Sequence, residues 1–323
     1  MIYRSSKLLK TLIIISLFVC QSYGQNVGTT SLQFLKIVPS AKIMAMGEAG
    51  VANTNDAAAV FMNPAGLTGV NKLDVSFNTV DWFLDTRINA ISAAYSMGNY
   101  GVFGIHVIDM DYGEFEETRV DHLGFVGDTY NPGLTGVTFN PTAFLVGLSY
   151  ARALTNNFSF GITGNYINED LFLDQISTFT FNAGMFYDMD FKSLKIGIAL
   201  RNLGPGVKYV EKKYSLPQTI IVGIKGDLIA PGENIFMKST DHRVSMAIDL
   251  IEPRDYDQEY HIGLEYGIYN TLNLRTGYKI NYDNESWTFG AGFIWKSIRL
   301  DYAYNDFGDY LEPAHRFSLG LSF

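Results

Sequence analysis

The sequence predicts an all-β protein: a 14-stranded antiparallel transmembrane β-barrel with a short N-terminal helical segment, or hatch, in its lumen. Three observations predict this fold class. Apolar and polar side chains alternate along many short segments, aromatic residues make up 14% of the chain, and charged residues make up only 18%. Soluble domains usually carry about 25% charged residues. After the first 20 residues the chain lacks any run near the roughly 18 apolar residues of a membrane helix. The composition indicates a membrane protein that crosses the bilayer with strands.

The alternation is clearest between Tyr260 and the terminal Phe323. In one predicted strand, one face carries four large aromatic side chains: Trp287, Phe289, Phe293 and Trp295. The other face carries small or polar residues such as Thr288. A period of two means that the two faces of a strand meet different surroundings. A soluble sandwich would bury the aromatic face in a core, whereas a transmembrane barrel turns it toward lipid.

We expect fourteen strands, an even number, as in single-chain bacterial barrels. Their predicted ranges are 72–83, 87–97, 101–112, 141–154, 157–169, 178–189, 193–203, 218–229, 243–252, 259–269, 271–281, 286–297, 298–306 and 315–323. If Phe323 faces the periplasm, short inner turns alternate with mostly longer outer loops, which are Gly113–Asn140, Asp170–Ser177, Gly204–Pro217 and Phe307–Ala314. The inner connection from Ala230 to His242 is long. It indicates either a long periplasmic turn or a strand that the pattern misses.

Residues 1–24 read as a signal peptide. The basic residues Arg4, Lys7 and Lys10 precede a mostly apolar core, and Gly24 ends a small-x-small cleavage site. Removal of this segment would also remove Cys20, the only cysteine, and make the formal net charge of −9 still more negative. A mature chain without cysteine excludes disulfides, and its acidity argues against nucleic acid as a partner.

The next segment, residues 25–70, lacks strand alternation. It is rich in alanine and glycine and includes the run from Ala57 to Val60, which favours a short helix. It ends at Asn63-Pro64-Ala65-Gly66-Leu67, where proline stops a helix and asparagine can bond its own backbone. We predict that 25–70 is a plug in the lumen of a barrel formed by residues 71–323. A periplasmic tail is the other interpretation.

Four short motifs in this segment resemble the start of the PorV/PorQ family. They are Phe34-Leu35-Lys36-Ile37-Val38-Pro39-Ser40-Ala41-Lys42, Met46-Gly47-Glu48-Ala49-Gly50-Val51-Ala52, Asn55-Asp56 and Asn63-Pro64-Ala65-Gly66-Leu67. The resemblance implies an outer-membrane protein associated with type IX secretion in the Bacteroidetes, with a fold similar to the FadL fatty acid transporters. In FadL-like barrels the Asn-Pro-Ala element belongs to the hatch, which here maps onto Asn63, Pro64 and Ala65, followed by Gly66. Phe323 is similar to the terminal aromatic residue that barrel assembly machinery accepts.

The polar faces of the C-terminal strands predict charges in the lumen. We assign Glu265, Arg275, Lys279, Arg299, Asp301 and Arg316 to a lumen charge network, and Lys296 to the same face. Buried charges need partners or water, so a paired network that braces a narrow barrel is one interpretation and a selectivity ring for a polar solute is the other. Such a wall is poorly suited to an acyl chain. The apolar hatch could nevertheless line a pocket for one.

Enzymatic and metal chemistry find little support in the sequence. The histidines show no metal-ligand spacing, and neither a nucleophile elbow nor a phosphate-binding loop occurs in the required setting. We therefore predict no catalytic residues, no cofactor and no metal. The acidic residues between Asp109 and Asp128 could bind calcium, but their pattern departs from an EF-hand, and a solvated acidic loop is the simpler interpretation.

These observations predict a non-enzymatic outer-membrane barrel of a Gram-negative bacterium that acts as a protein-interaction component of type IX secretion or surface assembly. The expected partners are outer-membrane lipid and lipopolysaccharide, the barrel assembly machinery, and a secretion translocon or an exported protein. The alternative is a FadL-like transporter of hydrophobic small molecules across the outer membrane.

Overall fold

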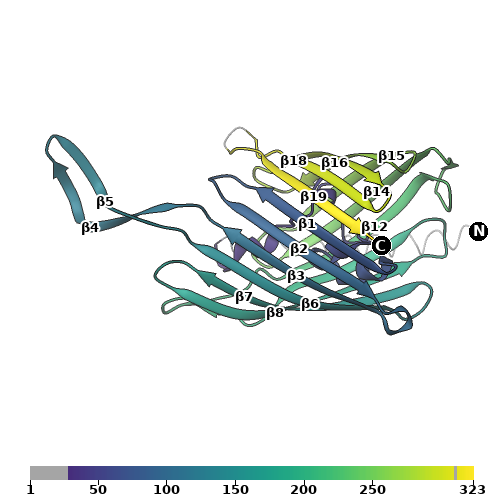
Figure 1. Ribbon diagram of the computed structural model, residues 1–323, viewed down its shortest axis with the longest axis horizontal. Coiled ribbons are helices and arrows are strands. Elements are labelled where there is room, and N and C mark those ends of the chain that lie inside the picture. The colour runs from purple at the N-terminus through teal and green to yellow at the C-terminus, as the bar shows by residue number, and fades with distance from the viewer. Residues whose placement is uncertain (1–27, 309–310) are drawn as a thin grey trace, which may run out of the picture.

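The computed structural model describes residues 28–308 and 311–323, so the predicted signal peptide at 1–24 lies outside the described residues. The described part forms a closed barrel of fourteen antiparallel strands (Figure 1), which confirms the predicted fold class. The strands are β1 (Leu73–Asp81), β2 (Arg87–Ser96), β3 (Val102–Asp111), β6 (Thr142–Ala153), β7 (Phe158–Asp170), β8 (Gln175–Asp188), β9 (Lys195–Leu203), β12 (Thr219–Ala230), β14 (His242–Pro253), β15 (Glu259–Ile268), β16 (Leu272–Ile280), β17 (Trp287–Trp295), β18 (Ile298–Asn305) and β19 (Ala314–Ser322). Every predicted strand is present, with ends that differ by at most three residues.

Each barrel strand pairs with its neighbours in the chain, and the ring closes between the first and the last. At this seam, Asp74 of β1 lies opposite Ser322 of β19, and Asp81 lies opposite His315. Full closure leaves the barrel wall without a free strand edge, which a membrane-spanning sheet requires because lipid cannot satisfy backbone N–H and C=O groups.

The two faces of the strands follow the predicted alternation. In β8, Phe179 and Phe181 point outward and are 58% and 60% exposed, whereas Thr178 and Thr180 point inward and are buried. The four aromatic residues of β17 are likewise exposed on the outside. Aromatic side chains outside and hydroxyl or amide side chains inside are the arrangement of a barrel whose outer wall contacts lipid.

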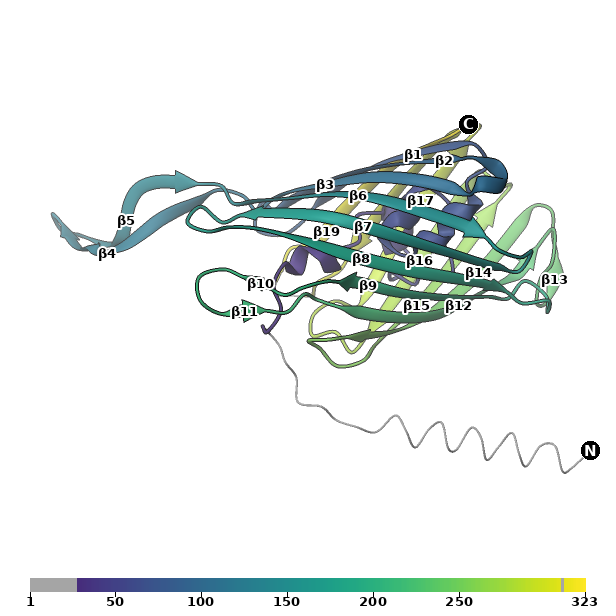
Figure 2. The ribbon, with the colours of Figure 1, turned by 90° about the horizontal axis from the view of Figure 1, so that it is seen from below.

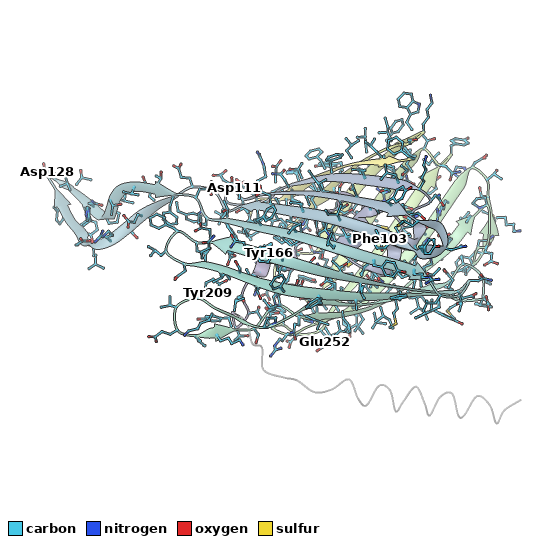
Figure 3. The ribbon with its side chains drawn as sticks, turned by 60° about the horizontal axis from the view of Figure 1, so that its bottom comes forward. Phe103, Asp111, Asp128, Tyr166, Tyr209 and Glu252 are labelled. Carbon is cyan, nitrogen blue, oxygen red and sulfur yellow. The ribbon has the colours of Figure 1, made fainter. Side chains whose placement is uncertain are left out.

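The loop between β3 and β6 differs from the prediction. We expected a long outer loop at Gly113–Asn140 and no strand within it, but two strands, β4 (Phe115–Val126) and β5 (Thr129–Phe139), pair into a long hairpin. The hairpin extends well beyond the barrel (Figure 1), with Asp111 near its root and Asp128 at its tip (Figure 3). A smaller hairpin, β10 (Val207–Lys208) with β11 (Lys213–Tyr214), lies in the loop between β9 and β12.

Both hairpins lie at the end of the barrel opposite Phe323. Short turns such as 269–271 and 296–297 lie at the end that holds Phe323. Outer-membrane barrels place short turns in the periplasm and long loops outside. We therefore refer to the inner, periplasmic end and to the outer end. The long inner connection is real: residues 231–241 join β12 to β14 and contain the two-residue strand β13 (Met237–Lys238).

The segment before β1 folds inside the ring (Figure 2). It contains short helical elements: the 3-10 helices η1 (Gln33–Lys36), η2 (Ala57–Phe61) and η3 (Pro64–Gly69), and the α-helical turn α2 (Ala41–Met44). A further 3-10 turn, η4 (Gly98–Tyr100), joins β2 to β3. We refer to residues 30–70 as the hatch. No helix in the described ranges is long and apolar enough to cross a membrane.

Candidate functional site

Asn63 joins the hatch to the barrel wall. Its side chain is fully buried, and its Nδ2 donates to the carbonyl oxygens of Val51 (2.8 Å), Met185 of β8 (3.3 Å) and Ile198 of β9 (3.4 Å). Its Oδ1 accepts from the backbone N–H of Ala65 at 3.1 Å, which caps η3. A buried amide that satisfies backbone groups of two strands fixes the hatch in one position.

The three residues that follow Asn63 fill space against the wall. Pro64 occupies the first turn of η3, where its missing N–H is not needed, and Pro64, Ala65 and Gly66 are all buried. Pro64 and Ala65 lie against Gly161 of β7, where a Cβ would come within 2.4 Å of the Pro64 carbonyl carbon. The predicted hatch motif therefore lies at the contact between plug and barrel.

The predicted charge network is divided into separate groups. Arg275 is central to the first: its Nε donates to Glu265 Oε2 and its Nη1 to Asp301 Oδ1, both at 2.6 Å. Its side chain is 3% exposed. Arg299 belongs to a second group and pairs with Asp74 of β1 at 2.8 Å.

Lys279 and Arg316 lie apart from these pairs. The Nζ of Lys279 contacts Glu285 at 2.5 Å and Glu48 of the hatch at 3.4 Å. Arg316 is completely buried: its Nε donates to the Val38 carbonyl oxygen, and its guanidinium lies 5.0 Å from the centre of the Trp82 ring. Of the six residues assigned to the predicted network, Lys279 and Arg316 thus make their direct contacts with residues outside that set. Lys296 was wrongly placed on the lumen face; it lies exposed in the turn between β17 and β18.

Ion pairs also hold the hatch from the inner side. Lys42 of the hatch contacts Asp56 at 3.2 Å, and Arg299 of the wall reaches the same carboxylate at 3.9 Å. Burial raises the pKa of Asp56, but the charges of Lys42 and Arg299 outweigh it and lower the pKa below the usual value. Asp56 is therefore a carboxylate at neutral pH that links hatch and wall. Asp56 belongs to one of the N-terminal motifs, but its ion pairs were not predicted, because the hatch shows no strand parity.

At the outer end, residues 30–36 form a strap across part of the barrel mouth. A bridge joins Thr30 to Ser215 of the loop between β9 and β12. Asp255, in the loop between β14 and β15, accepts from Thr30 Oγ1 at 2.5 Å and from Lys36 Nζ at 2.7 Å. Burial raises the pKa of Asp255, but the hydrogen bonds from Lys36 and Thr30 outweigh it and hold the pKa below its usual value of 3.8.

Substitution of Asp255 by asparagine is expected to loosen the strap and leave the barrel intact. The variant loses the ion pair with Lys36, a charge-assisted contact of about 1.5–3 kcal/mol. Amide hydrogen exchange in detergent should show lower protection at residues 31–37 at pH 7. Because the folded pKa of Asp255 is depressed, its stabilisation is present at neutral pH and is lost as pH falls through a value below 3.8.

In the native chain, protection factors of the strap should therefore fall only in strong acid, and in the variant they should be low throughout. Asp128→Asn, at the exposed tip of the hairpin, is the matched control and should leave strap protection unchanged. Equal strap protection in Asp255→Asn and the native chain at pH 7 would contradict the assignment.

A cavity of about 360 Å³ lies in the outer half of the lumen. Its apolar lining includes Met62 of the hatch and Trp82, Phe83, Ile221, Ile251 and Phe307 of the strands and outer loops. Its polar lining includes Lys36, Glu48, Arg201, Glu259, Lys279 and Tyr282. A concave site of this size with mixed lining can hold a small amphipathic molecule. Much of the apolar lining comes from loops and hatch, where strand alternation gives no signal.

A second cavity, of about 430 Å³, opens at the inner end and is lined mainly by polar and charged side chains, among them Lys42, Asp56, Asp74, Arg243 and Arg299. Glu48 and Met62 of the hatch line the outer cavity, and Lys42 and Asn55 line the inner one. Between them lies the packed core of the hatch, with residues such as Met44 and Ala59 fully buried. The hatch thus occupies the middle of the lumen.

The hairpin β4–β5 is the second candidate site. It bears five carboxylates in or next to β4 and the tip, at Glu114, Glu116, Glu117, Asp121 and Asp128. At its root, Phe139 stacks on Phe115 (ring centroids 5.9 Å apart) and on Phe172 of the loop between β7 and β8 (4.6 Å). The carboxylates are spread along the hairpin, and the described residues contain no group of three or more His, Cys, Asp or Glu placed to hold a metal ion.

Phe323 ends the chain at the seam of the barrel. Its backbone N–H donates to the Leu73 carbonyl oxygen at 2.8 Å, and the residue is 62% exposed. An exposed terminal aromatic residue on the last strand is available for recognition during assembly. Its role as an assembly signal stays a prediction.

Known structures share this architecture at low sequence identity. The toluene transporter TodX of Pseudomonas putida superposes with a TM-score of 0.56 at 11% identity, over 86% of this chain and 96% of that chain. A FadL homologue of Pseudomonas aeruginosa superposes with a TM-score of 0.53 at 11% identity, over 93% of this chain and 99% of that one. Identities this low show the fold alone. Among curated proteins, none matches the chain by sequence.

Sequence comparison with protein families is more specific. Residues 20–245 match the family described as "Type IX secretion system protein PorV". The match covers more than half of the chain and includes the hatch, the hairpin β4–β5 and the first eight strands of the barrel. Together with the FadL-like fold, it confirms the resemblance inferred from the N-terminal motifs. The chain belongs to the PorV family and is an outer-membrane β-barrel.

Proposed function

We propose that this barrel is a non-enzymatic protein-interaction component of type IX secretion or surface assembly in a Gram-negative bacterium of the Bacteroidetes. In this proposal the hairpin β4–β5 contacts a secretion translocon or an exported protein. The observation that carries it is the hairpin itself, which projects from the outer end of the barrel and ends far from the rest of the molecule (Figure 1). The family match supports the type IX assignment.

The hairpin has the properties of a surface that is completed by a partner. An isolated two-stranded hairpin is marginally stable in water because it has no third element to pack against. Here both faces are mostly exposed, and apolar side chains remain in water: Val120, Phe125 and Val126 are 84%, 73% and 72% exposed. Exposed apolar clusters of this kind mark interaction sites.

The charge of the hairpin indicates the kind of surface that it contacts. Its five carboxylates are opposed by one arginine, Arg119, which pairs with Asp121 at 3.1 Å. Complementary charge steers association and selects partners. The partner surface should therefore be basic, with apolar side chains placed to cover Val120 and Phe125.

The plugged lumen supports a role at the surface of the barrel. The hatch is held to the wall at several levels along the barrel axis: by Asn63, by the Lys42–Asp56–Arg299 contacts and by the strap. A folded or extended polypeptide does not fit past a hatch held in this way. A protein partner therefore engages the loops, and the barrel serves as a rigid support for them.

Removal of the hairpin is expected to abolish partner binding and leave the barrel folded. In this variant a short Gly-Ser linker replaces Phe115–Phe139. Because the barrel strands β3 and β6 pair directly with each other, the wall does not depend on the hairpin. Affinity purification from native membranes should recover type IX components or exported proteins with the native chain and lose them with the variant, while heat-modifiable migration on gels stays unchanged.

A double charge reversal makes the test more specific. Glu116→Lys with Glu117→Lys should reduce recovery of the same partner in a salt-dependent manner. Glu211→Lys, in the small hairpin β10–β11, is the matched control and should not. Undiminished recovery of a type IX component by the chain without its hairpin would overturn the assignment of this surface.

The outer cavity supports a second candidate, a transporter of hydrophobic small molecules. The structurally similar TodX is described as a monoaromatic hydrocarbon channel, and the cavity here presents Trp82, Phe83 and Phe307. This candidate predicts that deletion of the gene slows uptake of such compounds and that the chain without its hairpin restores uptake fully. Normal uptake in the deletion strain would eliminate it.

A further inference from the structure

The connection between β12 and β14 is folded against the barrel wall. The backbone N–H groups of Ile235 and Phe236 donate to the carbonyl oxygens of Asp227 (2.9 Å) and Leu228 (3.0 Å) of β12. Lys192 Nζ donates to the Ile235 carbonyl oxygen at 2.7 Å. The physical reason is a difference in strand length: β9 pairs with β12 only as far as Lys225, so the edge of β12 beyond that point would be unpaired.

Strand β13 covers this edge in parallel register, with Met237 beside Ile229 and Lys238 beside Ala230. Figure 2 shows β13 at the inner end of the barrel, alongside the end of β12. Residues side by side on paired strands share a face. The face that Met237 occupies therefore follows from the face of Ile229.

Ile229 belongs to the lipid-facing side of the wall. On β12, Ile220, Val222 and Ile224 point outward and are 48%, 41% and 39% exposed. A bulge between Asp227 and Ile229 shifts the alternation by one residue, and Ile229 lies opposite Val244. Val244 has the same parity as the outward-facing Ile248, so Val244 and its partner Ile229 also face outward.

Ile235 and Met237 consequently lie on the membrane side of the connection. Ile235 confirms this independently: a Cβ added to the outward-facing Gly226 would lie 2.9 Å from Ile235 Cδ1. Phe236, between them, points to the opposite face and is 77% exposed, whereas Met237 is 56% exposed. Two adjacent apolar side chains thus point in opposite directions at the inner end.

The depth of Met237 can be derived from the outer rim. Ile220 lies opposite Glu252, an exposed carboxylate on the same outward face (Figure 3), which places that level at the outer headgroups. From Ile220 to Ile229 the strand rises about 30 Å, or about 23 Å along the membrane normal at a tilt of about 40°. The apolar band of such barrels is about 25 Å tall. Met237 is therefore at the inner rim of the band.

We infer that the 231–241 connection is a membrane foot: Ile235 and Met237 insert into the boundary between headgroups and acyl chains of the inner leaflet, and Phe236 faces the aqueous periplasm. Neighbouring side chains fit this boundary, because Phe191 is 59% exposed and Lys192 lies 5.6 Å from its ring centre. Three acidic residues, Asp190, Glu233 and Asp241, offset the positive charges of Lys192 and Lys238. Apolar insertion, rather than attraction to anionic lipid, therefore holds the foot.

Spin labels at adjacent positions test the inference. Cys20 is the only cysteine, so Cys20→Ser gives a background in which Met237→Cys and Phe236→Cys each carry one label. In phosphatidylethanolamine–phosphatidylglycerol liposomes, the label at 237 should be several-fold more accessible to oxygen than to a water-soluble nickel complex. The label at 236 should show the reverse preference. Val222→Cys and Val120→Cys provide the lipid and water references.

Each pattern of results supports or overturns the inference. Preference for oxygen at 237 together with preference for the nickel complex at 236 supports the foot. Water-like behaviour at both positions would overturn it and leave the connection as a periplasmic surface. Lipid-like behaviour at both would overturn the assignment of faces. All four sites are exposed, so the labels do not disturb the barrel core.

Discussion

Replacement of Gly277 by alanine is expected to displace the hatch from the barrel wall. Gly277 lies on the lumen face of β16, and a Cβ there would come within 2.0 Å of the backbone nitrogen of Gly47 and 2.3 Å of the Met46 carbonyl carbon. The Gly47 N–H also donates to Thr288 Oγ1 at 2.9 Å, a bond that the displacement would break. Overpacking typically costs about 1–3 kcal/mol, and we expect a value near 3 kcal/mol here because the Cβ would meet backbone atoms. Gly47 itself has φ of +64°, so its chain has little room to adjust.

Two measurements report the effect of Gly277→Ala. Thermal unfolding in detergent should begin at a lower temperature, and liposomes that contain the variant should admit small polar solutes faster than those with the native chain. Gly164→Ala is the matched control, because Gly164 lies on the outer face of β7 and its nearest neighbour to a Cβ is a Phe181 ring carbon at 3.6 Å. Gly277→Ala with native unfolding and native permeability would show that the hatch is not held by close backbone packing.

Replacement of Arg275 by methionine is expected to destabilise the barrel by about 3–5 kcal/mol. The substitution leaves Glu265 and Asp301 as two buried carboxylates without their shared cation, at 13% and 10% side-chain exposure. The removal of one partner from a buried network costs more than the network contributes in total, because the remaining charges stay desolvated. Equilibrium unfolding in denaturant and detergent measures the loss.

A compensated variant distinguishes charge from packing. Arg275→Met combined with Glu265→Gln and Asp301→Asn removes all three charges and should recover most of the lost stability. Arg254→Met is the control for arginine loss: Arg254 lies in an outer loop and bonds to Gln218 at 3.0 Å, and its replacement should cost about 1 kcal/mol or less. A triple variant less stable than Arg275→Met would contradict the electrostatic explanation.

The barrel could be predicted from the sequence because lipid and lumen impose different chemistry on alternate residues. Phe289 and Thr288 are neighbours in the chain and lie on opposite sides of the wall, one exposed to lipid and one buried. The same requirement acts on every strand, so the pattern is repeated fourteen times in the described residues and defines the strand ends closely. The alternation of short and long connections then distinguished the inner end from the outer end.

The hairpin β4–β5 could not be recognised in this way. Both of its faces meet water, so selection for one apolar face is absent, and residues such as Thr118 and His122 show no alternation. Its pairing is also irregular, with a bulge between Thr118 and Leu123. The same limit applies to β13, whose pairing with β12 depends on where β9 begins.

The charge groups of the lumen were only partly predictable for a related reason. Strand parity places Arg275 and Lys279 on the same face of β16, but it does not show which hatch residue approaches each one. Glu48, which contacts Lys279, lies in a segment without periodicity and has φ of +61°. Contacts between the plug and the wall depend on how the two fold together.

The path of the hatch has a consequence for the order of assembly. The chain is fastened at the outer end by Thr30 and Lys36, crosses the lumen, and enters β1 at Leu73 at the inner end. Once β1 and β19 have paired, this segment could enter the ring only by threading through it end first. If the hatch folds against β16 and β8 first, the last strands can instead close around it. In that order of assembly, closure between β1 and β19 would depend on a lumen that already holds the hatch.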